Sequence, residues 1–300
     1  MKNSKSLLTI FIITLCFSLV LASTGALFVI AERFFPVAVK SMKDDLLFIG
    51  VDKRLCAYSL NEGASYLSFS SLLSDERTEL NNSLVLISAK HPICDSLDFS
   101  SVCEYKSSDV YFDYCAHEAY RSLADHISKK FNTKLYIMSA FRSEEEQADI
   151  YNEQGPDTAQ KPGESEHQSG LALDVYVSGY AGASFFKTDV GKYVNSFCSN
   201  YGFIIRYPSE AKDVTGIDFE PWHIRYVGRP HSDIIALNSI TLEEYLNSLI
   251  IDNYYSIGNY VILKTDGSHP IGIPEQYEAL TVSPDNCGNY VLTFKLYDKG

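Results

Sequence analysis

The feature that most constrains this 300-residue chain is an uncharged run near its N-terminus, from Ser6 to Ala31. A helix rises about 1.5 Å per residue, so a run of this length can cross a hydrocarbon core of about 30 Å. Lys2 and Lys5 precede the run, and basic residues before a span favour a cytoplasmic N-terminus. Residues 1–32 are therefore predicted to be a cytoplasmic N-terminus and a single-pass membrane anchor, with the rest of the chain outside the cell membrane.

A cleaved signal peptide is the alternative interpretation of the same segment. Small residues at 22–26 offer a cleavage site, and cleavage would release a secreted protein. The apolar run continues through residues 27–30, which is longer than a signal peptide needs, and this favours the anchor. Both interpretations place the body of the protein outside the membrane.

The charge balance excludes one class of partner. The formal net charge is −13, and no cluster of lysines and arginines stands out. Nucleic-acid binding needs a basic face that displaces counterions from phosphates, so no nucleic-acid partner is expected. Six cysteines follow the predicted anchor; this number permits disulfides in an exported protein, but it allows 15 pairings, and free thiols remain equally open.

The pattern of apolar residues divides the exported part into three segments. Residues 33–80 give few clear signals and form a lead-in of unknown role. Residues 81–249 alternate predicted helices and strands without a regular βαβ rhythm, which indicates an α+β domain with a small mixed or antiparallel sheet and flanking helices. Residues 250–300 contain β-rich runs separated by turn residues and are predicted to be a small β-rich extension.

Several elements of the central segment can be placed by residue range. The apolar spacing favours a helix over 109–130, and Ser143 with Glu146 forms a capping box that predicts a helix near 144–151. Another capping residue, Thr241, predicts a closing helix. Strands are expected at 135–138, 171–177, 203–205 and 224–227.

A first group of chemistry-bearing residues lies in the segment 165–174, which reads SEHQSGLALD. His167 and Asp174 are both good zinc ligands, and a turn at Gly170 would bring them to face one another. Strand alternation places Asp174 on the same face as the small Ala172, where a metal ion has room. Alone, this pair is weak evidence, because a histidine at a turn is more often an ordinary surface residue.

A second group supplies a third ligand and a carboxylate. His223 follows Glu220 by three positions, and Pro221 between them fixes its own φ and would hold Glu220 out of strand alternation with His223. A catalytic zinc keeps three protein ligands and an open position, and a nearby carboxylate that does not bind the metal can take a proton from water. Trp222, the single tryptophan, either lines such a site or anchors the core.

Both groups together resemble the zinc D-alanyl-D-alanine carboxypeptidases of the VanY kind, which share a fold with the VanX-type dipeptidases. The resemblance covers about residues 82–248. Its first pattern, S-x-H-x-x-G-x-A-x-D, is met in full between Ser165 and Asp174, and its second, E-x-W-H, is met between Glu220 and His223. An arginine-bearing segment of the family is matched by residues 139–143 together with Gln147.

The resemblance implies a role for each matched residue. His167, Asp174 and His223 would hold Zn²⁺, and Glu220 would be the general base and later the acid. Arg142 would face the developing oxyanion or a substrate carboxylate. The weaker assignments are substrate-binding residues: Gln147, Ser165 and Trp222.

The resemblance also implies a reaction and its substrate. The chain is expected to be a D,D-carboxypeptidase that removes the terminal D-alanine from peptidoglycan stem peptides ending in D-Ala-D-Ala. An L,D-carboxypeptidase acting on tetrapeptide stems is an alternative, and a non-catalytic zinc-containing module that binds the cell wall is another. Glycopeptide resistance and routine wall trimming are both consistent with the expected reaction.

Overall fold

The computed structural model describes residues 55–156, 158–274 and 276–297. The predicted anchor, residues 1–32, and residues 33–54 of the predicted lead-in lie outside these ranges. Within them, no helix is long and apolar enough to span a membrane.

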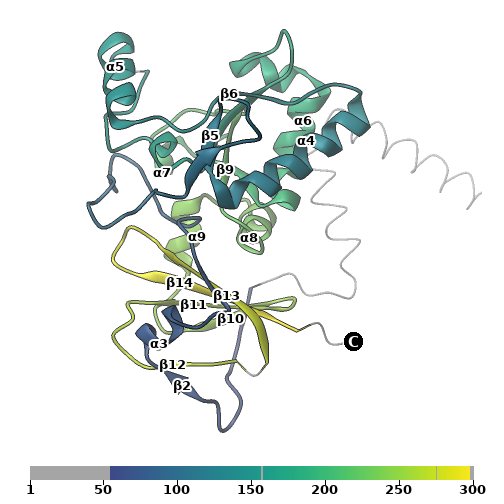
Figure 1. The fold of residues 1–300 in the computed structure, drawn as a ribbon. Coiled ribbons are helices and arrows are strands. Elements are labelled where there is room, and N and C mark those ends of the chain that lie inside the picture. The colour runs from purple at the N-terminus through teal and green to yellow at the C-terminus, as the bar shows by residue number, and fades with distance from the viewer. Residues whose placement is uncertain (1–54, 157, 275, 298–300) are drawn as a thin grey trace, which may run out of the picture. The chain divides into compact units, whose positions relative to one another are not determined.

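A four-stranded antiparallel sheet forms the centre of the region predicted to be an α+β domain (Figure 1). Its strands run in the order β6-β7-β9-β8, and each neighbouring pair is antiparallel. The bounds are Tyr136–Ser139 for β6, Ala172–Tyr176 for β7, His223–Tyr226 for β9 and Phe203–Ile205 for β8. The expected class, a small antiparallel sheet with flanking helices, is confirmed.

Two helices cover one face of this sheet. Leu173 and Val175 of β7 pack in one core with Leu123 of α4 and Val194 of α6, because alternation turns these two strand residues toward the helices. Asp174 between them therefore points to the opposite face. The helices of this region, with the short 3₁₀ helices that adjoin them, are η1 Tyr114–Ala116, α4 His117–Phe131, α5 Glu144–Gln154, η2 Glu166–Ser169, η3 Gly182–Lys187, α6 Asp189–Phe197, η4 Cys198–Tyr201, α7 Lys212–Thr215, α8 His231–Asn238 and α9 Leu242–Ser248.

The predicted helix starts are right in two cases and wrong in one. Ser143 and Thr241 each make a complete capping box, so α5 and α9 begin where the capping residues indicate. The helix expected from residue 109 instead begins at His117. Residues 111–113 form a strand, β5, that pairs with β4 (Val102–Glu104), and Asp113 then caps η1 by accepting from the backbone N–H of Cys115. Buried Phe112 and Ala116 fit helical spacing equally well, which is why the pattern misplaced the start.

A second, six-stranded sheet combines residues from both flanks of the described chain (Figure 1). Its order is β1-β10-β11-β14-β13-β3, and the pairing of β3 with β13 is parallel. Parts of the predicted lead-in and of the predicted extension thus share one sheet. Its strands are β1 Cys56–Ala57, β3 Thr78–Leu80, β10 Tyr254–Ile257, β11 Tyr260–Thr265, β13 Tyr277–Pro284 and β14 Tyr290–Leu296; beside them lie α3 Phe69–Leu73 and the pair β2 Tyr66–Leu67 and β12 Ile271–Gly272.

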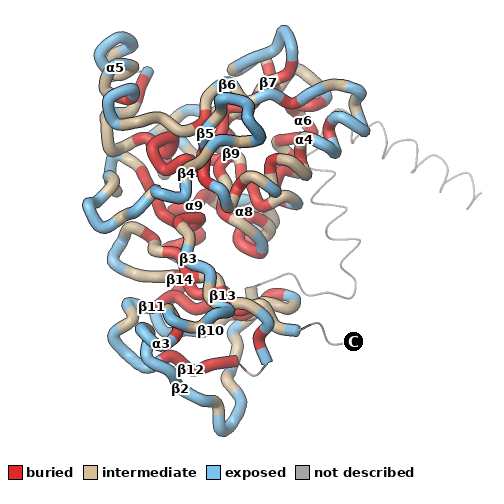
Figure 2. The backbone as a smooth tube through the Cα atoms, in the orientation of Figure 1, coloured by how far each residue is buried: buried red, intermediate tan, exposed pale blue. Residues whose placement is uncertain are grey.

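The second sheet packs against the end of the α+β region. Ile235 of α8 and Leu246 of α9 share a core with Ile262 of β11 and Val291 of β14. Figure 2 shows that α8 and α9 are largely buried along this side. No disulfide joins any two of the six cysteines in the described part of the chain.

Candidate metal centre

Strand register brings two of the predicted ligands together. Asp174 of β7 lies directly opposite His223 of β9 in the antiparallel pair. His167 reaches the same place because η2 is followed by Gly170, whose φ of 71° turns the chain into β7. A Cβ at Gly170 would lie 2.7 Å from Val102 Cγ2 and 3.0 Å from the Asp113 nitrogen, so this turn requires glycine.

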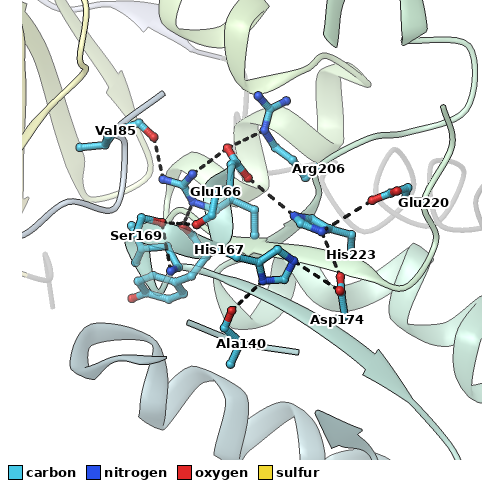
Figure 3. A network of polar contacts seen from close by, with 12 residues as sticks. Val85, Ala140, Glu166, His167, Ser169, Asp174, Arg206, Glu220 and His223 are labelled. Atoms are coloured by element: carbon cyan, nitrogen blue, oxygen red, sulfur yellow. Dashed lines mark hydrogen bonds and ion pairs between the residues drawn. The ribbon is translucent and has the colours of Figure 1, made fainter. Parts of the chain in front are cut away.

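The three predicted ligands form one buried cluster (Figure 3). One ligand atom from each of His167, Asp174 and His223 lies within 4.8 Å of the others. Nε2 of His167 lies 3.3 Å from Asp174 Oδ2, and Nδ1 of His223 lies 3.0 Å from Asp174 Oδ1. These two separations, which end at different oxygens of Asp174, are close to the roughly 3.3 Å between ligand atoms that lie about 2.0–2.1 Å from a tetrahedral zinc.

Hydrogen bonding fixes the tautomer of His167. Its Nδ1 lies 2.7 Å from the carbonyl oxygen of Ala140, and because a carbonyl can only accept, Nδ1 carries the proton. The lone pair is therefore on Nε2, the nitrogen that faces Asp174. Metal-binding histidines are commonly oriented in this way by a carbonyl behind the ring.

Unpartnered buried atoms mark the same place. In the part of the chain that the structure describes, three buried side-chain atoms make no hydrogen bond: Glu166 Oε2, Asp174 Oδ1 and His223 Nε2. Asp174 Oδ1 is only 3.0 Å from His223 Nδ1 and still makes none, as expected where both atoms point to a shared third position. A buried polar atom without a partner costs about 1–3 kcal/mol, which a cation bound there would offset for Asp174. The donor set thus fits a zinc ion.

Neighbouring charges and burial shift the pKa values of the three cluster residues in opposite directions. Burial disfavours the charged form of His223, but the nearby carboxylates of Asp174 and Glu166 outweigh it and raise the pKa of this histidine to about 9. For Asp174, burial acts in the upward direction, but the two histidines outweigh it and hold its pKa below the usual range. Burial lowers the pKa of His167.

Glu220 and Arg142 lie beside the cluster. Glu220 opens a turn in which the N–H of His223 donates to its carbonyl, and its Oε2 lies 3.7 Å from His223 Nδ1. Burial raises the pKa of this carboxyl group. Arg142 Nη2 lies 3.4 Å from Asp174 Oδ2, and burial lowers the pKa of its guanidinium more than nearby carboxylates raise it.

The remaining predicted residues differ in their surroundings. Gln147 is buried; its Oε1 accepts from Arg142 at 3.3 Å, and its Nε2 donates to the carbonyl of Gln160. Ser165 is buried next to η2 and makes no side-chain capping bond there. Trp222 is partly buried and packs against the core that contains Leu173 and Val175 of β7. Substrate contacts by these three residues stay predictions.

Glu166 is a component that the sequence analysis did not identify. Its Oε1 accepts from Arg206 Nε and Arg225 Nη1, both at 2.7 Å, and all three side chains are fully buried. Arg206 also binds Glu243 of α9 through two hydrogen bonds of 2.9 and 2.6 Å. One signal was available: Arg225 stands two positions after His223, so alternation places both side chains on one strand face.

The fold and the site together define a class. A buried His–Asp–His cluster on an antiparallel sheet, with an unbound carboxylate and an arginine beside it, is typical of metal-dependent hydrolases. The comparison with known proteins identifies the family within this class of hydrolases. The chain belongs to the VanY family, whose model, described as D-alanyl-D-alanine carboxypeptidase, matches residues 110–229.

Two curated relatives share substantial sequence with the chain. A D-alanyl-D-alanine carboxypeptidase of Enterococcus faecium is 33% identical over 63% of this chain and 65% of its own length. The bifunctional D-Ala-D-Ala dipeptidase and D-Ala-D-Ala carboxypeptidase VanXYC of Enterococcus gallinarum is 32% identical over 55% of this chain and 93% of its own length. The chain therefore spans slightly less than two thirds of the first relative and nearly all of the second.

Two solved structures share the fold. The vancomycin resistance D,D-dipeptidase VanXYg, in complex with a D-Ala-D-Ala phosphinate analogue, has a TM-score of 0.61 and 26% identity over 71% of this chain and 94% of its own. The LdcB LD-carboxypeptidase has a TM-score of 0.51 and 28% identity over 64% of this chain and 98% of its own.

Proposed function

We propose that the chain is a zinc-dependent D,D-carboxypeptidase that removes the terminal D-alanine from peptidoglycan stem peptides. The observation that carries the proposal is the convergence of His167, Asp174 and His223 within 4.8 Å, with Glu220 beside them. The relatives named as D-Ala-D-Ala carboxypeptidases support the substrate class.

The ligand side chains would hold the ion, and the neighbouring residues would handle protons and charge. When bound, zinc would polarise the scissile carbonyl group and lower the pKa of water. Glu220 accepts a proton from the attacking water and later donates one to the departing amino group of D-alanine. Because burial raises the pKa of its carboxyl group, a proton taken up there can be held and passed on.

Arg142 supplies the fixed positive charge that this reaction needs. Its Nε donates to Ser139 Oγ at 2.9 Å, and its Nη1 donates to Gln147 Oε1 at 3.3 Å, so the guanidinium is held before substrate arrives. We infer that it stabilises the negative charge that develops on the carbonyl oxygen, or binds the terminal carboxylate of the stem peptide. In either case its low mobility makes the stabilisation more effective.

The proposal includes a location outside the cytoplasmic membrane. Peptidoglycan lies there, and the uncharged run at residues 6–31 is long enough for an anchor. A membrane anchor would hold the catalytic region near the wall. The secreted form after signal cleavage would meet the same substrate.

L,D-carboxypeptidase activity on tetrapeptide stems is the second candidate. The likeness to LdcB, which is described as an LD-carboxypeptidase, favours it. Release of D-alanine from pentapeptide and from tetrapeptide stems, compared at equal concentrations, separates the two activities.

The first test uses the purified full chain in mild detergent, with zinc content and D-alanine release measured together. Glu220→Gln is expected to keep about one zinc per chain and to lower turnover by about 10²–10⁴-fold, since a general base is removed. Asp218→Asn is the matched control, because Asp218 is exposed two positions earlier and pairs with Lys212 at the surface. Unchanged turnover in Glu220→Gln contradicts the proposed mechanism, and absence of zinc from the wild type contradicts the site.

A further inference from the structure

Glu166 is the most enclosed carboxylate next to the candidate metal centre. One of its oxygens, Oε1, is bound by two arginines, and the other, Oε2, has no hydrogen-bond partner. Nε2 of His223 lies 3.8 Å from Oε2 and also has no partner (Figure 3). Two of the three unpartnered buried atoms in the described residues therefore face each other.

The two nitrogens of His223 have different surroundings. Nδ1 faces Asp174 and Glu220, at 3.0 and 3.7 Å, and Nε2 faces Glu166 on the other side of the ring. A neutral imidazole carries one proton, and the nitrogen without it is the ligand. For Nδ1 to bind a metal ion, the proton must therefore remain on Nε2.

Glu166 is held so that it can fix that proton. Its Oε1 accepts from Arg206 Nε and Arg225 Nη1, both at 2.7 Å, and this fixes the carboxylate with Oε2 facing the histidine. Their side chains are fully buried, and Arg225 is itself fixed by the carbonyl groups of Ser83 and Val85. Such a buried ion cluster is a weak source of stability, because desolvation cancels much of the attraction. This makes a role at the neighbouring histidine the better account of the cluster.

We propose that Glu166 is a positioning residue: it accepts the Nε2–H of His223, leaves the Nδ1 lone pair for the metal ion, and thereby sets the zinc affinity of the site. The inference rests on the proposed function only in taking zinc as the ion. A carboxylate behind a metal-binding histidine orients the ring and raises its basicity, and loss of such a partner weakens metal binding by about 10–100-fold.

The test measures zinc affinity of the full chain by chelator competition, in the wild type, Glu166→Gln and Glu243→Gln. Glu166→Gln is expected to bind zinc about 10–100-fold more weakly. Glu243→Gln is the matched control, because it removes a carboxylate from the same Arg206 without touching His223. It is expected to lower thermal stability and to keep the wild-type zinc affinity.

A second measurement needs no variant and so does not depend on the folding of Glu166→Gln. Selective ¹⁵N labelling of histidine in the zinc-loaded wild type reports which ring nitrogen of His223 carries the proton, and Nε2 is expected. A proton on Nδ1, or a folded Glu166→Gln chain with wild-type zinc affinity, overturns the inference and leaves the proposed function intact. A wild-type chain that binds no zinc overturns both.

Discussion

Two histidines eight positions apart, His223 and His231, are both 4% exposed, but their surroundings are opposite. His223 lies among the carboxylates of the candidate metal centre, and its Nε2 has no hydrogen-bond partner. His231, at the junction of α8, α9 and the second sheet, has a hydroxyl group at each ring nitrogen: Tyr245 at 2.6 Å from Nδ1 and Thr293 at 2.9 Å from Nε2.

The difference appears in their protonation. Carboxylate neighbours raise the pKa of His223 to about 9, whereas burial alone lowers the pKa of His231 to about 3. Burial by itself therefore does not indicate a ligand. What separates a functional histidine from a structural one here is the combination of nearby carboxylates and an unpartnered atom, since a structural residue normally has its hydrogen bonds satisfied.

The largest expected difference between the two sites is in stabilisation by zinc. At a free zinc concentration about 1,000 times the dissociation constant, a ligand that binds only the native state adds about 4 kcal/mol to the free energy of unfolding. The wild type and His231→Gln should gain this stabilisation, and His223→Asn should not. Denaturant unfolding with and without zinc measures it; a gain in His223→Asn equal to that of the wild type would show that this histidine is no ligand.

The next largest expected effect is a loss of stability on acidification, and it comes from His231. His231 stays neutral in the native state down to about pH 3, whereas in the unfolded chain it is protonated below about pH 6.5. The unfolded state therefore binds more protons between these values, and stability falls as the pH falls. At pH 4.5, two units below the unfolded pKa, His231 should account for a loss of about 3 kcal/mol.

Comparison with His231→Gln isolates this contribution from the carboxylates that also titrate. Free energies of unfolding of zinc-free wild type and variant are measured at pH 7.5 and 4.5. The wild type should lose about 3 kcal/mol more than the variant on acidification. Equal losses would show that His231 is protonated as easily in the folded protein as in the unfolded chain.

The smallest expected effect concerns the hydroxyl group of Thr293. Thr293→Val keeps the shape of the side chain but removes a hydrogen bond to the buried Nε2 of His231, at a cost of about 2 kcal/mol in unfolding free energy. Thr281→Val, directly across the strand pair from Thr293 and without a hydrogen bond to His231, is the control and should change stability by less than about 0.5 kcal/mol. Similar losses in both variants would mean that the hydrogen bond to His231 contributes nothing specific.

The ligand cluster was predictable because its signal is local in the sequence. His167 and Asp174 lie within one turn-and-strand segment, and Glu220 and His223 lie within one turn, so residue spacing describes each half. The capping box at Ser143 is equally local. Strand register then joins the two halves.

Contacts and strand pairings between residues far apart in the sequence could not be predicted from a local pattern. Glu166 is bound by Arg206, Arg225 and, through Arg206, by Glu243 of α9, and no sequence pattern near Glu166 indicates these partners. The same holds for β1 and β3, strands of two and three residues that are too short for a clear period. Their place in a sheet is set by pairing with β10 and β13.

The pairing of β3 with β13 imposes an order on biosynthesis. Thr78 can pair with Leu280 only after about 200 further residues have been synthesised. Synthesis of these residues takes about 10–40 s at 5–20 residues per second. During this time the region around the candidate metal centre can be completed first, and the second sheet closes last. A chain interrupted before residue 277 would therefore leave the edge of β3 unpaired, and such edges promote aggregation.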